Sequence, residues 1–206
     1  MNHHRLTLLN IAPMLISHRE EITDDIADLY RRGVITRNAF SITLTPEGVP
    51  LMDKAAILGE QFLLFRESLK KKSDVPCGIL IQATVGHSWT PDTPAAGQKF
   101  TFPDGAEPYI FCPMGQEFRT YLDQSVRALA KLKPDFFMLD DDFRMITGRG
   151  GCYCPLHLEG FRKKTGKLYS RESLLQAMEN DVALADAWDR WQKETLAETA
   201  AIIRHA

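Results

Sequence analysis

The chain has 206 residues, of which 44% are hydrophobic and 25% are charged, and its formal net charge is −2. This length allows one sizeable core, and a near-neutral charge without a Lys/Arg stripe gives no reason to expect a nucleic-acid partner. No apolar run approaches the roughly 20 residues that span a bilayer, and the N-terminal segment lacks a signal-peptide cleavage pattern. We therefore expect a cytoplasmic protein with no membrane partner.

Strand and helix patterns alternate along most of the chain. A strand over 5–12 precedes a helix that Ser17 and Glu20 are expected to begin as a capping box and that stops at Gly33. The remaining predicted elements are strands over 38–45, 77–86 and 135–141, helices over 51–72 and 114–133, and, after the fourth strand, helices over 159–166, over 170–180 and from about 182 onward.

The four predicted strands are short and apolar, which is typical of strands buried on both faces of a parallel sheet. A doubly wound open sheet and part of a (β/α)8 barrel both fit this alternation. No G-x-G-x-x-G sequence follows the first strand and no Walker motif occurs, which favours the barrel. We predict a single α/β domain over 1–206, in which a parallel sheet of four β/α units forms half of a TIM barrel.

A Cys/His motif occupies the loop at 148–160. Cys152, Cys154 and His157 form C-x-C-x-x-H, and Cys112 ends the loop that precedes the third long helix. If consecutive strand-end loops are neighbours, the four residues come together, and three thiolates with one imidazole form a closed structural zinc site. Unliganded thiols and a disulfide are the alternatives, although four cysteines in a chain of this length do not make a disulfide scaffold.

Three consecutive aspartates, Asp140, Asp141 and Asp142, follow the fourth apolar run. Strand alternation would place Asp140 and Asp142 on one side and Asp141 on the other, unless the strand has already ended. Clustered carboxylates raise the proton affinity of at least one member, which could then act as a general acid. Alternatively, the cluster binds a divalent cation such as Mg²⁺, or Arg144 and Arg149 neutralise it.

Other polar and aromatic residues lie at or beyond the ends of the first three strands, where α/β enzymes place their sites. Trp89 could stack on a sugar ring or anchor its loop, and His87 could bind substrate or hold the loop locally. Asn10 and Glu47 are weaker candidates after the first and second strands. Cys77 opens the third strand and is expected in the core.

The segment DDDFRMITGRGGCYCPLHLEGFRKKTG resembles the stretch after the fourth strand of clan A glycoside hydrolases, most of all family 42 of the β-galactosidases. That family has an Asn-Glu pair at the strand end, then Cys-Tyr-Cys-x-x-Cys, and a cysteine about forty residues upstream that completes a zinc site. Cys112, Cys152 and Cys154 match this pattern, and His157 stands in place of the last cysteine. The match covers roughly residues 108–168 and includes Phe161, Arg162 and Gly166 of the following helix.

The resemblance implies catalytic roles for Asp142 and Asp141, which occupy the place of the Asn-Glu pair. Asp142 would protonate the glycosidic oxygen, and Asp141 would bind a sugar hydroxyl. An aspartate sets the carboxyl back by roughly 1.5 Å relative to a glutamate, and retaining enzymes hold their two carboxyls only about 5 to 5.5 Å apart. The residues expected to contact the carbohydrate substrate are Asp140, Arg144, Trp89, His87 and Asn10.

The chain is short for a complete barrel, which needs about 250 residues and eight strands. In the resembling enzymes the nucleophile follows the seventh strand, and the last predicted helix here has no glycine stop. We therefore expect the N-terminal half of a larger barrel, inactive alone, that forms a homodimer or pairs with a missing C-terminal half. Trp188 and Trp191 would lie in its core or at the dimer surface. A non-catalytic zinc-stabilised carbohydrate-binding or assembly module is the main rival, and a Mg²⁺-dependent hydrolase is a third hypothesis.

Overall fold

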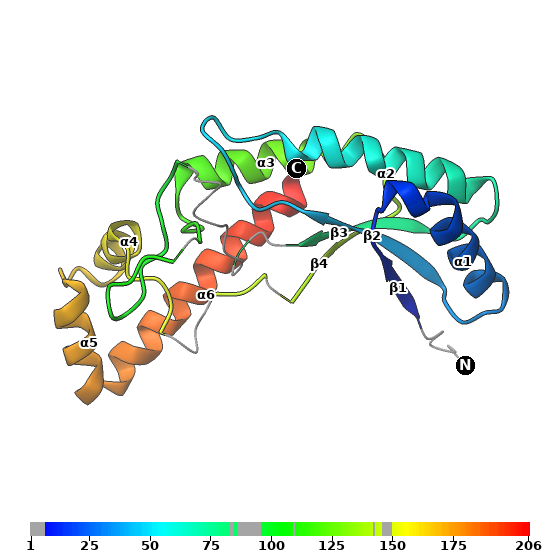
Figure 1. The fold of residues 1–206 in the computed structure, drawn as a ribbon. Helices are drawn as coiled ribbons and strands as arrows, with labels where there is room; N and C mark the ends of the chain where they lie inside the picture. Colours follow the sequence, from blue (N-terminus) through cyan, green and yellow to red (C-terminus); the bar gives the residue numbers. More distant parts are fainter. Residues whose placement is uncertain (1–6, 83–84, 86–95, 109, 142, 146–149) are drawn as a thin grey trace, which may run out of the picture. The chain divides into compact units, whose positions relative to one another are not determined.

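A computed structural model describes residues 7–82, 85, 96–108, 110–141, 143–145 and 150–206 (Figure 1). The chain divides into two compact units, which we call the sheet unit and the cysteine unit. The sheet unit comprises Met1–Leu44, Asp53–Gln82 and Arg127–Asp140, and the cysteine unit comprises Thr45–Met52, Ala83–Val126 and Asp141–Ala206. The single-domain organisation stays a prediction, because two such units can belong to one domain.

The sheet unit contains four parallel strands, which confirms the predicted α/β fold. They are β1 (Leu9–Ala12), β2 (Arg37–Thr43), β3 (Cys77–Gln82) and β4 (Phe137–Leu139). Their order in the sheet is β1-β2-β3-β4, so that each strand pairs with the next one in the sequence. Consecutive order is that of a (β/α)8 barrel, whereas a doubly wound sheet reverses direction at a switch point.

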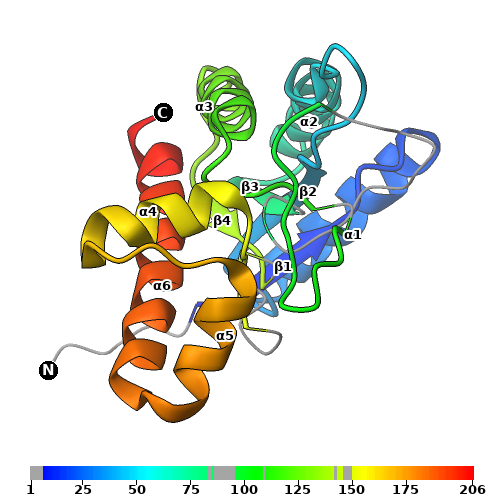
Figure 2. The same cartoon turned by 90° about the vertical axis from the view of Figure 1, so that its left-hand side faces the viewer.

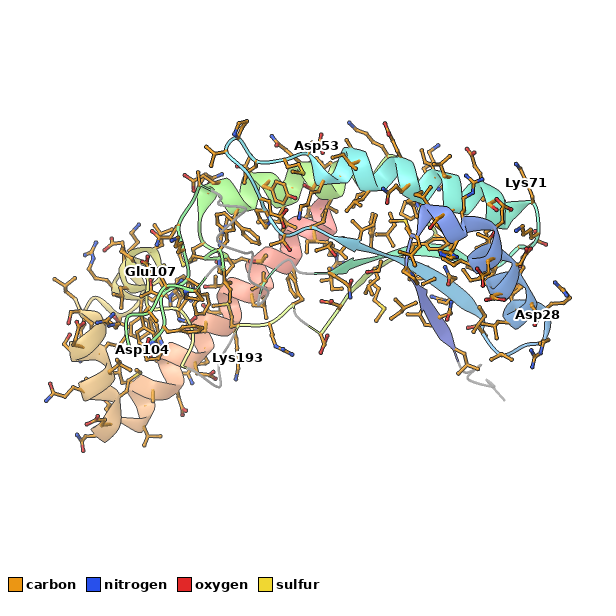
Figure 3. The ribbon with its side chains drawn as sticks, in the orientation of Figure 1. Asp28, Asp53, Lys71, Asp104, Glu107 and Lys193 are labelled. Carbon is orange, nitrogen blue, oxygen red and sulfur yellow. The ribbon has the colours of Figure 1, made fainter. Side chains whose placement is uncertain are left out.

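Helices α1 (Arg19–Arg31) and α2 (Lys54–Lys70) cover one face of this sheet (Figure 2). Phe40 of β2 points to that face, where its ring centroid lies 6.3 Å from that of Phe62 and 5.2 Å from that of Phe65. Asp53, labelled in Figure 3, begins α2, because its carboxylate accepts a hydrogen bond from the backbone N–H of Ala56 at 3.0 Å.

The start of α1 differs from the prediction. Ser17 lies in a short 3₁₀ helix, η1 (Ile16–His18), and α1 follows His18, whose side chain makes no capping hydrogen bond. Glu20 does not reach back to the helix start, because its carboxylate accepts a bond from Ser68 at 3.2 Å and pairs with Lys72 at 3.0 Å. The capping box is therefore wrong, and Glu20 instead links α1 to α2.

The opposite face of the sheet bears side chains that no helix of the sheet unit covers, and we call it the open face. Alternation along the strands places Ile11, Ala39 and Leu80 there; Ile11 is 49% exposed, whereas Ala39 and Leu80 are buried. Arg37 lies on the same face, half-buried, with its guanidinium 5.1 Å from the ring centroid of Phe136. Its Nε is buried, and among the described residues the guanidinium has no hydrogen-bond or ion-pair partner.

The cysteine unit is mainly helical. It holds most of α3 (Gln116–Ala130), together with α4 (Pro155–Thr165), α5 (Arg171–Asn180) and α6 (Val182–His205). A buried aromatic and aliphatic core joins the last three helices, and its members are Tyr153, Phe161, Leu174, Trp188 and Trp191. None of the helices in the described part of the chain has the length and apolar character that a bilayer-spanning segment requires.

Candidate metal centre

The four predicted metal ligands come together in the cysteine unit. The Nδ1 atom of His157 lies 3.2 Å from the sulfur of Cys112 and 3.6 Å from that of Cys154, and these two sulfurs are 3.4 Å apart. The sulfur of Cys152 completes a group whose ligand atoms all lie within 4.8 Å of one another. A Cys₃His cluster that could hold a metal ion is thus present.

Local structure explains how Cys154 and His157 face the same point. Cys154 is the N-cap residue of α4, with extended backbone angles, and Pro155 occupies the first helical position, which suits its fixed φ. His157 follows in the first turn, three residues after Cys154, so the two side chains lie on one side of the helix start. Helix α4 begins four residues earlier than the sequence pattern predicted.

A folded-back loop brings Cys112 to the cluster from a different part of the sequence. Lys99 and Phe111 form an antiparallel bridge, and the backbone N–H of Cys112 donates to the carbonyl of Gln98 at 2.8 Å. The N–H of Met114 then donates to the Cys112 sulfur at 3.4 Å. Such N–H···S bonds stabilise a thiolate, so this loop supplies charge compensation as well as a ligand.

The spacing of the ligand atoms fits tetrahedral zinc. A Zn–S length near 2.3 Å and a Zn–N length near 2.0 Å require about 3.8 Å between two sulfurs and about 3.6 Å between sulfur and nitrogen. The three distances given above are 3.2 to 3.6 Å, so a metal needs only small outward shifts of the ligands. All four side chains have no exposed area, which makes the site closed.

The three thiols differ in proton affinity. Burial raises the pKa of Cys112 and the pKa of Cys152, because a thiolate loses its hydration there. Hydrogen bonding to these two thiols, together with the neighbouring His157, instead lowers the pKa of Cys154 well below its ordinary value. Cys154 is therefore the thiol that gives up its proton most readily, and all three thiols become thiolates when a cation replaces the protons.

The side of His157 that faces away from the sulfurs lies against α6. The indole N–H of Trp191 donates to the carbonyl of His157 at 3.0 Å, and the two rings meet edge to face at 6.2 Å. The Nε2 atom of His157 is buried and has no hydrogen-bond partner among the described residues. The imidazole thus presents Nδ1 to the cluster and is held through its backbone and by ring packing.

Contacts from α6 were not anticipated from the sequence. Trp188 and Trp191 were expected in the core or at a dimer surface, and Gln192 was not considered. In the structure all three hydrogen-bond to the backbone of the ligand-bearing segment. The only sequence signal is a polar glutamine at helical spacing from two buried tryptophans, which marks a face but does not identify its partner.

Asp140 and Asp141 lie beyond the fourth strand and not in it. Strand β4 ends at Leu139, and the N–H of Asp140 makes a long 3.4 Å bond to the carbonyl of Ile81. The carboxylate of Asp141 is 88% exposed and lies 3.7 Å from Arg144, whose guanidinium also donates to the Asp141 carbonyl at 3.1 Å. The strand has thus already ended before Asp140, which is the condition under which the predicted alternation does not apply.

Other predicted site residues are placed as follows. Asn10 lies within β1 and not after it, and its amide donates to the side chain of Asn38 on β2 at 2.7 Å. Glu47 is half-buried, and its carbonyl accepts a bond from Met52 at 2.7 Å. Asp142, His87, Trp89 and Arg149 lie outside the described residues.

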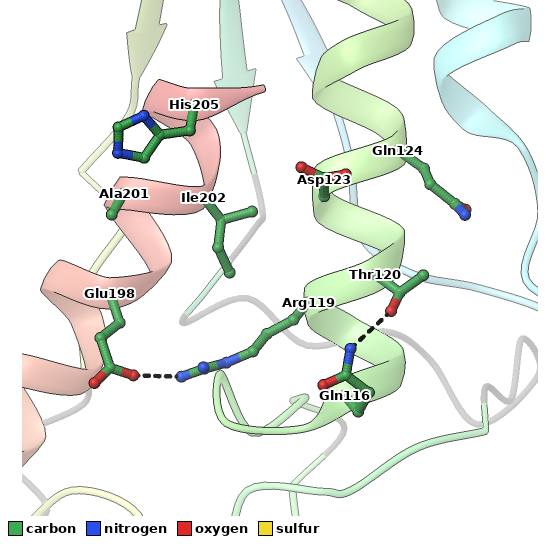
Figure 4. Close-up of a pocket in the computed structure, with 9 residues that line it drawn as sticks. All are labelled: Gln116, Arg119, Thr120, Asp123, Gln124, Glu198, Ala201, Ile202 and His205. Carbon is green, nitrogen blue, oxygen red and sulfur yellow. Dashed lines mark hydrogen bonds and ion pairs between the residues drawn. The ribbon is translucent and has the colours of Figure 1, made fainter.

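The cysteine unit also contains an open pocket of 510 Å³ between α3 and α6 (Figure 4). Arg119 from α3 and Glu198 from α6 meet there, with a 2.8 Å hydrogen bond between guanidinium and carboxylate. Gln116 and Thr120 also bond to each other, at 3.1 Å. Because these polar groups satisfy one another, we assign no ligand to this pocket.

Comparison of the chain with protein-family models, with curated proteins and with solved structures finds no match. The resemblance to glycoside hydrolases therefore rests on the sequence motif alone.

Proposed function

We propose that the chain binds one zinc ion through Cys112, Cys152, Cys154 and His157, and that this zinc is structural. The closed, four-ligand cluster supports the proposal, since a catalytic zinc keeps one position open for water or substrate and here every ligand is fully buried. The zinc would fasten the loop that carries Cys112 to the start of α4.

The ligand set favours zinc over the alternatives. Three soft thiolates and an imidazole at tetrahedral spacing disfavour Mg²⁺ and Ca²⁺, which take oxygen ligands. A disulfide needs sulfur atoms about 2.05 Å apart, whereas Cys112 and Cys154 are separated by 3.4 Å and all four cysteines are free.

Metal analysis tests this proposal. The purified chain is expected to carry one tightly held zinc, which is lost in Cys152→Ser and retained in Asp142→Asn. A chain that carries no zinc after expression with zinc, or a Cys152→Ser variant that keeps it, would contradict a structural zinc centre.

We further propose that the chain is half of a glycoside hydrolase-like barrel. The consecutive parallel strands and the zinc motif placed after β4 support this assignment. In a complete barrel Asp142 would donate a proton to the glycosidic oxygen, Asp141 would bind a sugar hydroxyl, and a carboxylate from a later β/α unit would attack the anomeric carbon.

The isolated chain is expected to show little or no glycosidase activity, because the described part of the chain supplies four of the eight strands of a barrel. Hydrolysis of aryl glycosides is the appropriate assay, with Asp142→Asn as the control. Turnover by the wild type that disappears in this variant would show that the four units are already a complete enzyme.

A non-catalytic zinc-stabilised module that binds carbohydrate or serves assembly is the second candidate. The exposed Asp141, paired with Arg144 on the surface, favours it, because a carboxylate so placed is not held in a dry active site. Sugar binding without turnover would support this candidate. A Mg²⁺ requirement that depends on Asp140 or Asp142 would instead favour a metal-dependent hydrolase.

We propose that further β/α units extend the sheet and cover the exposed part of the open face around Ile11, supplied either by a second copy of the chain or by the remaining half of a barrel. Two features support a partner: β1 and β4 are edge strands within the described sheet, and the half-buried Arg37 pairs with no carboxylate among the residues that the structure describes. Light scattering on the purified chain tests the homodimer. If the second copy supplies a carboxylate to Arg37, Arg37→Glu is expected to weaken the dimer, with the paired surface residue Arg144→Glu as control.

A further inference from the structure

Three side chains on one face of α6 end on the backbone of the segment that carries the metal ligands. They are Trp188, Trp191 and Gln192, which have the i, i+3, i+4 spacing of a single helix face. Each is buried, with at most 6% of its surface exposed. Helix α6 itself contributes no ligand to the cluster.

Gln192 hydrogen-bonds to both backbone groups of Cys152, the N–H and the carbonyl. Its Oε1 accepts from the Cys152 N–H at 3.0 Å, and its Nε2 donates to the Cys152 carbonyl at 3.1 Å. One side-chain amide thus makes the two backbone hydrogen bonds that a neighbouring β-strand would otherwise make to this residue. Because Cys152 lies in an irregular segment, these two bonds fix its peptide groups and hence the direction of its Cα–Cβ bond.

The contact between Gln192 and Cys152 also explains why glycine precedes Cys152. Gly151 has a φ of +83°, which disfavours side chains, and a Cβ atom there would lie 2.7 Å from the amide carbon of Gln192. No other residue could occupy the position without moving either Gln192 or the backbone. The close approach of Gln192 to Cys152 therefore requires a glycine at position 151.

The two tryptophans hold the segment on either side of Cys152. The indole N–H of Trp188 donates to the carbonyl of Gly150 at 3.2 Å, and that of Trp191 donates to the carbonyl of His157 at 3.0 Å. Trp188 also packs against the ring of Tyr153, between Cys152 and Cys154, at a centroid distance of 4.9 Å. Helix α6 thus binds the ligand segment at three points.

We infer that Gln192 is a positioning residue of the metal centre, and that docking of α6 and binding of the metal stabilise each other. The inference rests on the proposed zinc site. Groups that orient metal ligands from outside the coordination sphere change metal affinity by roughly 10- to 100-fold. By linkage, a metal that needs Cys152 in its docked position also strengthens the hold of α6 on the segment.

The test compares zinc affinities, measured by competition with a chromophoric chelator. Gln192→Met keeps the length and removes both hydrogen bonds, and we expect a loss of 10- to 100-fold. Trp188→Phe keeps the aromatic packing and removes one donor, for which we expect roughly 2- to 10-fold. The control is Thr199→Val, because Thr199 is buried on the same helix and its hydroxyl bonds only within the helix, to Thr195.

Two further readouts separate positioning from a general loss of stability. The visible spectrum of the Co²⁺-substituted protein should change in Gln192→Met and stay unchanged in Thr199→Val. Hydrogen exchange of the Cys152 amide in metal-free protein should be slow in the wild type and fast in Gln192→Met. If Gln192→Met does not fold, the zinc affinity of Trp188→Phe is compared with that of the wild type instead.

Equal zinc affinity and an unaltered cobalt spectrum in Gln192→Met, or in Trp188→Phe if that variant must serve, would overturn the inference. A wild-type chain that binds no metal would instead overturn the proposed zinc function. In that case the Cys152 amide decides the remaining question: exchange that stays slow in Gln192→Met shows that the glutamine does not hold the segment.

Discussion

Cys112, Cys152 and Cys154 face one point but differ in proton affinity. Burial raises the pKa of the first two, and hydrogen bonding lowers the pKa of Cys154. In the metal-free cluster Cys112 and Cys152 therefore hold their protons more tightly than Cys154 does. Zinc can bind only after these protons leave, so its affinity should rise with pH and fall on acidification.

This difference predicts that zinc binding at pH 8 releases fewer than three protons, because Cys154 gives up its proton more readily than its neighbours do. Calorimetric titration in buffers of different ionisation enthalpy measures the number. Release of three protons would mean that Cys154 is protonated like its neighbours, and release of none would mean that all three thiols are already ionised.

Cys77 provides a pH effect that is independent of the metal centre. Burial, and secondarily the carboxylate of Asp135, raises the pKa of this thiol from 9.0 to about 12. The unfolded chain loses this proton above pH 9 while the folded chain keeps it, so the folded state is destabilised as the pH rises from 9 toward 12. We expect the free energy of unfolding to fall by roughly 1 kcal/mol between pH 8 and pH 10 on account of this group.

Urea unfolding at the two pH values checks the effect, with Cys77→Ala as the comparison. The variant should lose about 1 kcal/mol less than the wild type over the same interval. Parallel decreases in wild type and variant would show that Cys77 ionises equally in the folded and unfolded chain.

Helix starts show where a local sequence pattern succeeds and where it fails. The helix predicted over 170–180 begins at Ser170, whose hydroxyl oxygen accepts a bond from the Ser173 N–H at 3.1 Å, while the Ser173 hydroxyl oxygen accepts one from the Ser170 N–H. Ser17 has a possible capping partner at the same spacing, Glu20, but Ser68 of α2 and Lys72 just beyond that helix bind the Glu20 carboxylate. A tertiary ion pair thus replaced the local cap, and it cannot be seen in a window of a few residues.

The two serines form a matched pair of substitutions. Ser170→Ala should lower the free energy of unfolding by about 1 kcal/mol, because the backbone N–H of Ser173 loses its acceptor. Ser17→Ala should change it by less than about 0.5 kcal/mol, since no capping bond is lost. Chemical denaturation measures both, and equal effects would contradict the assigned helix starts.

The strands and helices of the chain could be predicted because their signals are local. Short apolar runs such as CGILIQ, and helical spacing as in Phe62 and Phe65, predicted elements that the structure confirms within a few residues. The cluster of Cys112 with Cys152 and Cys154 could be predicted from ligand chemistry. The role of Gln192 could not, because its partner is a backbone group forty residues away in sequence, and backbone groups leave no mark in a sequence.

Asn10 illustrates the opposite error. It was read as a strand-end site residue, yet it lies inside β1 and bonds to Asn38 on the neighbouring strand. A polar side chain among apolar ones is the signal of a site, but a second polar residue in register on the next strand satisfies it equally well. Strand register depends on pairing across the sheet and is not available from one strand alone.

The division into two units predicts how the whole chain responds to metal loss. All four ligands belong to the cysteine unit, whereas β2, β3 and the Phe40 cluster belong to the sheet unit. Removal of zinc leaves buried thiols without their cation, so amides of α4 and of the loop around Cys112 should exchange faster. Amides of β2 and β3 should stay protected.

Hydrogen exchange followed by mass spectrometry, on wild type with and without chelator and on Cys152→Ser, resolves the two units. Loss of protection throughout β2 and β3 on chelation would show that the chain unfolds as one cooperative body. No change in α4 would show that the metal contributes nothing to its stability.

X-ray absorption at the zinc edge of the purified chain reports the coordination sphere itself. Three sulfur ligands at about 2.3 Å and one nitrogen at about 2.0 Å are the expected result, with the sulfur contribution reduced in Cys152→Ser. A sphere of oxygen and nitrogen atoms with no sulfur, or a zinc content that is not proportional to the protein, would show that Cys112, Cys152, Cys154 and His157 do not form a metal centre.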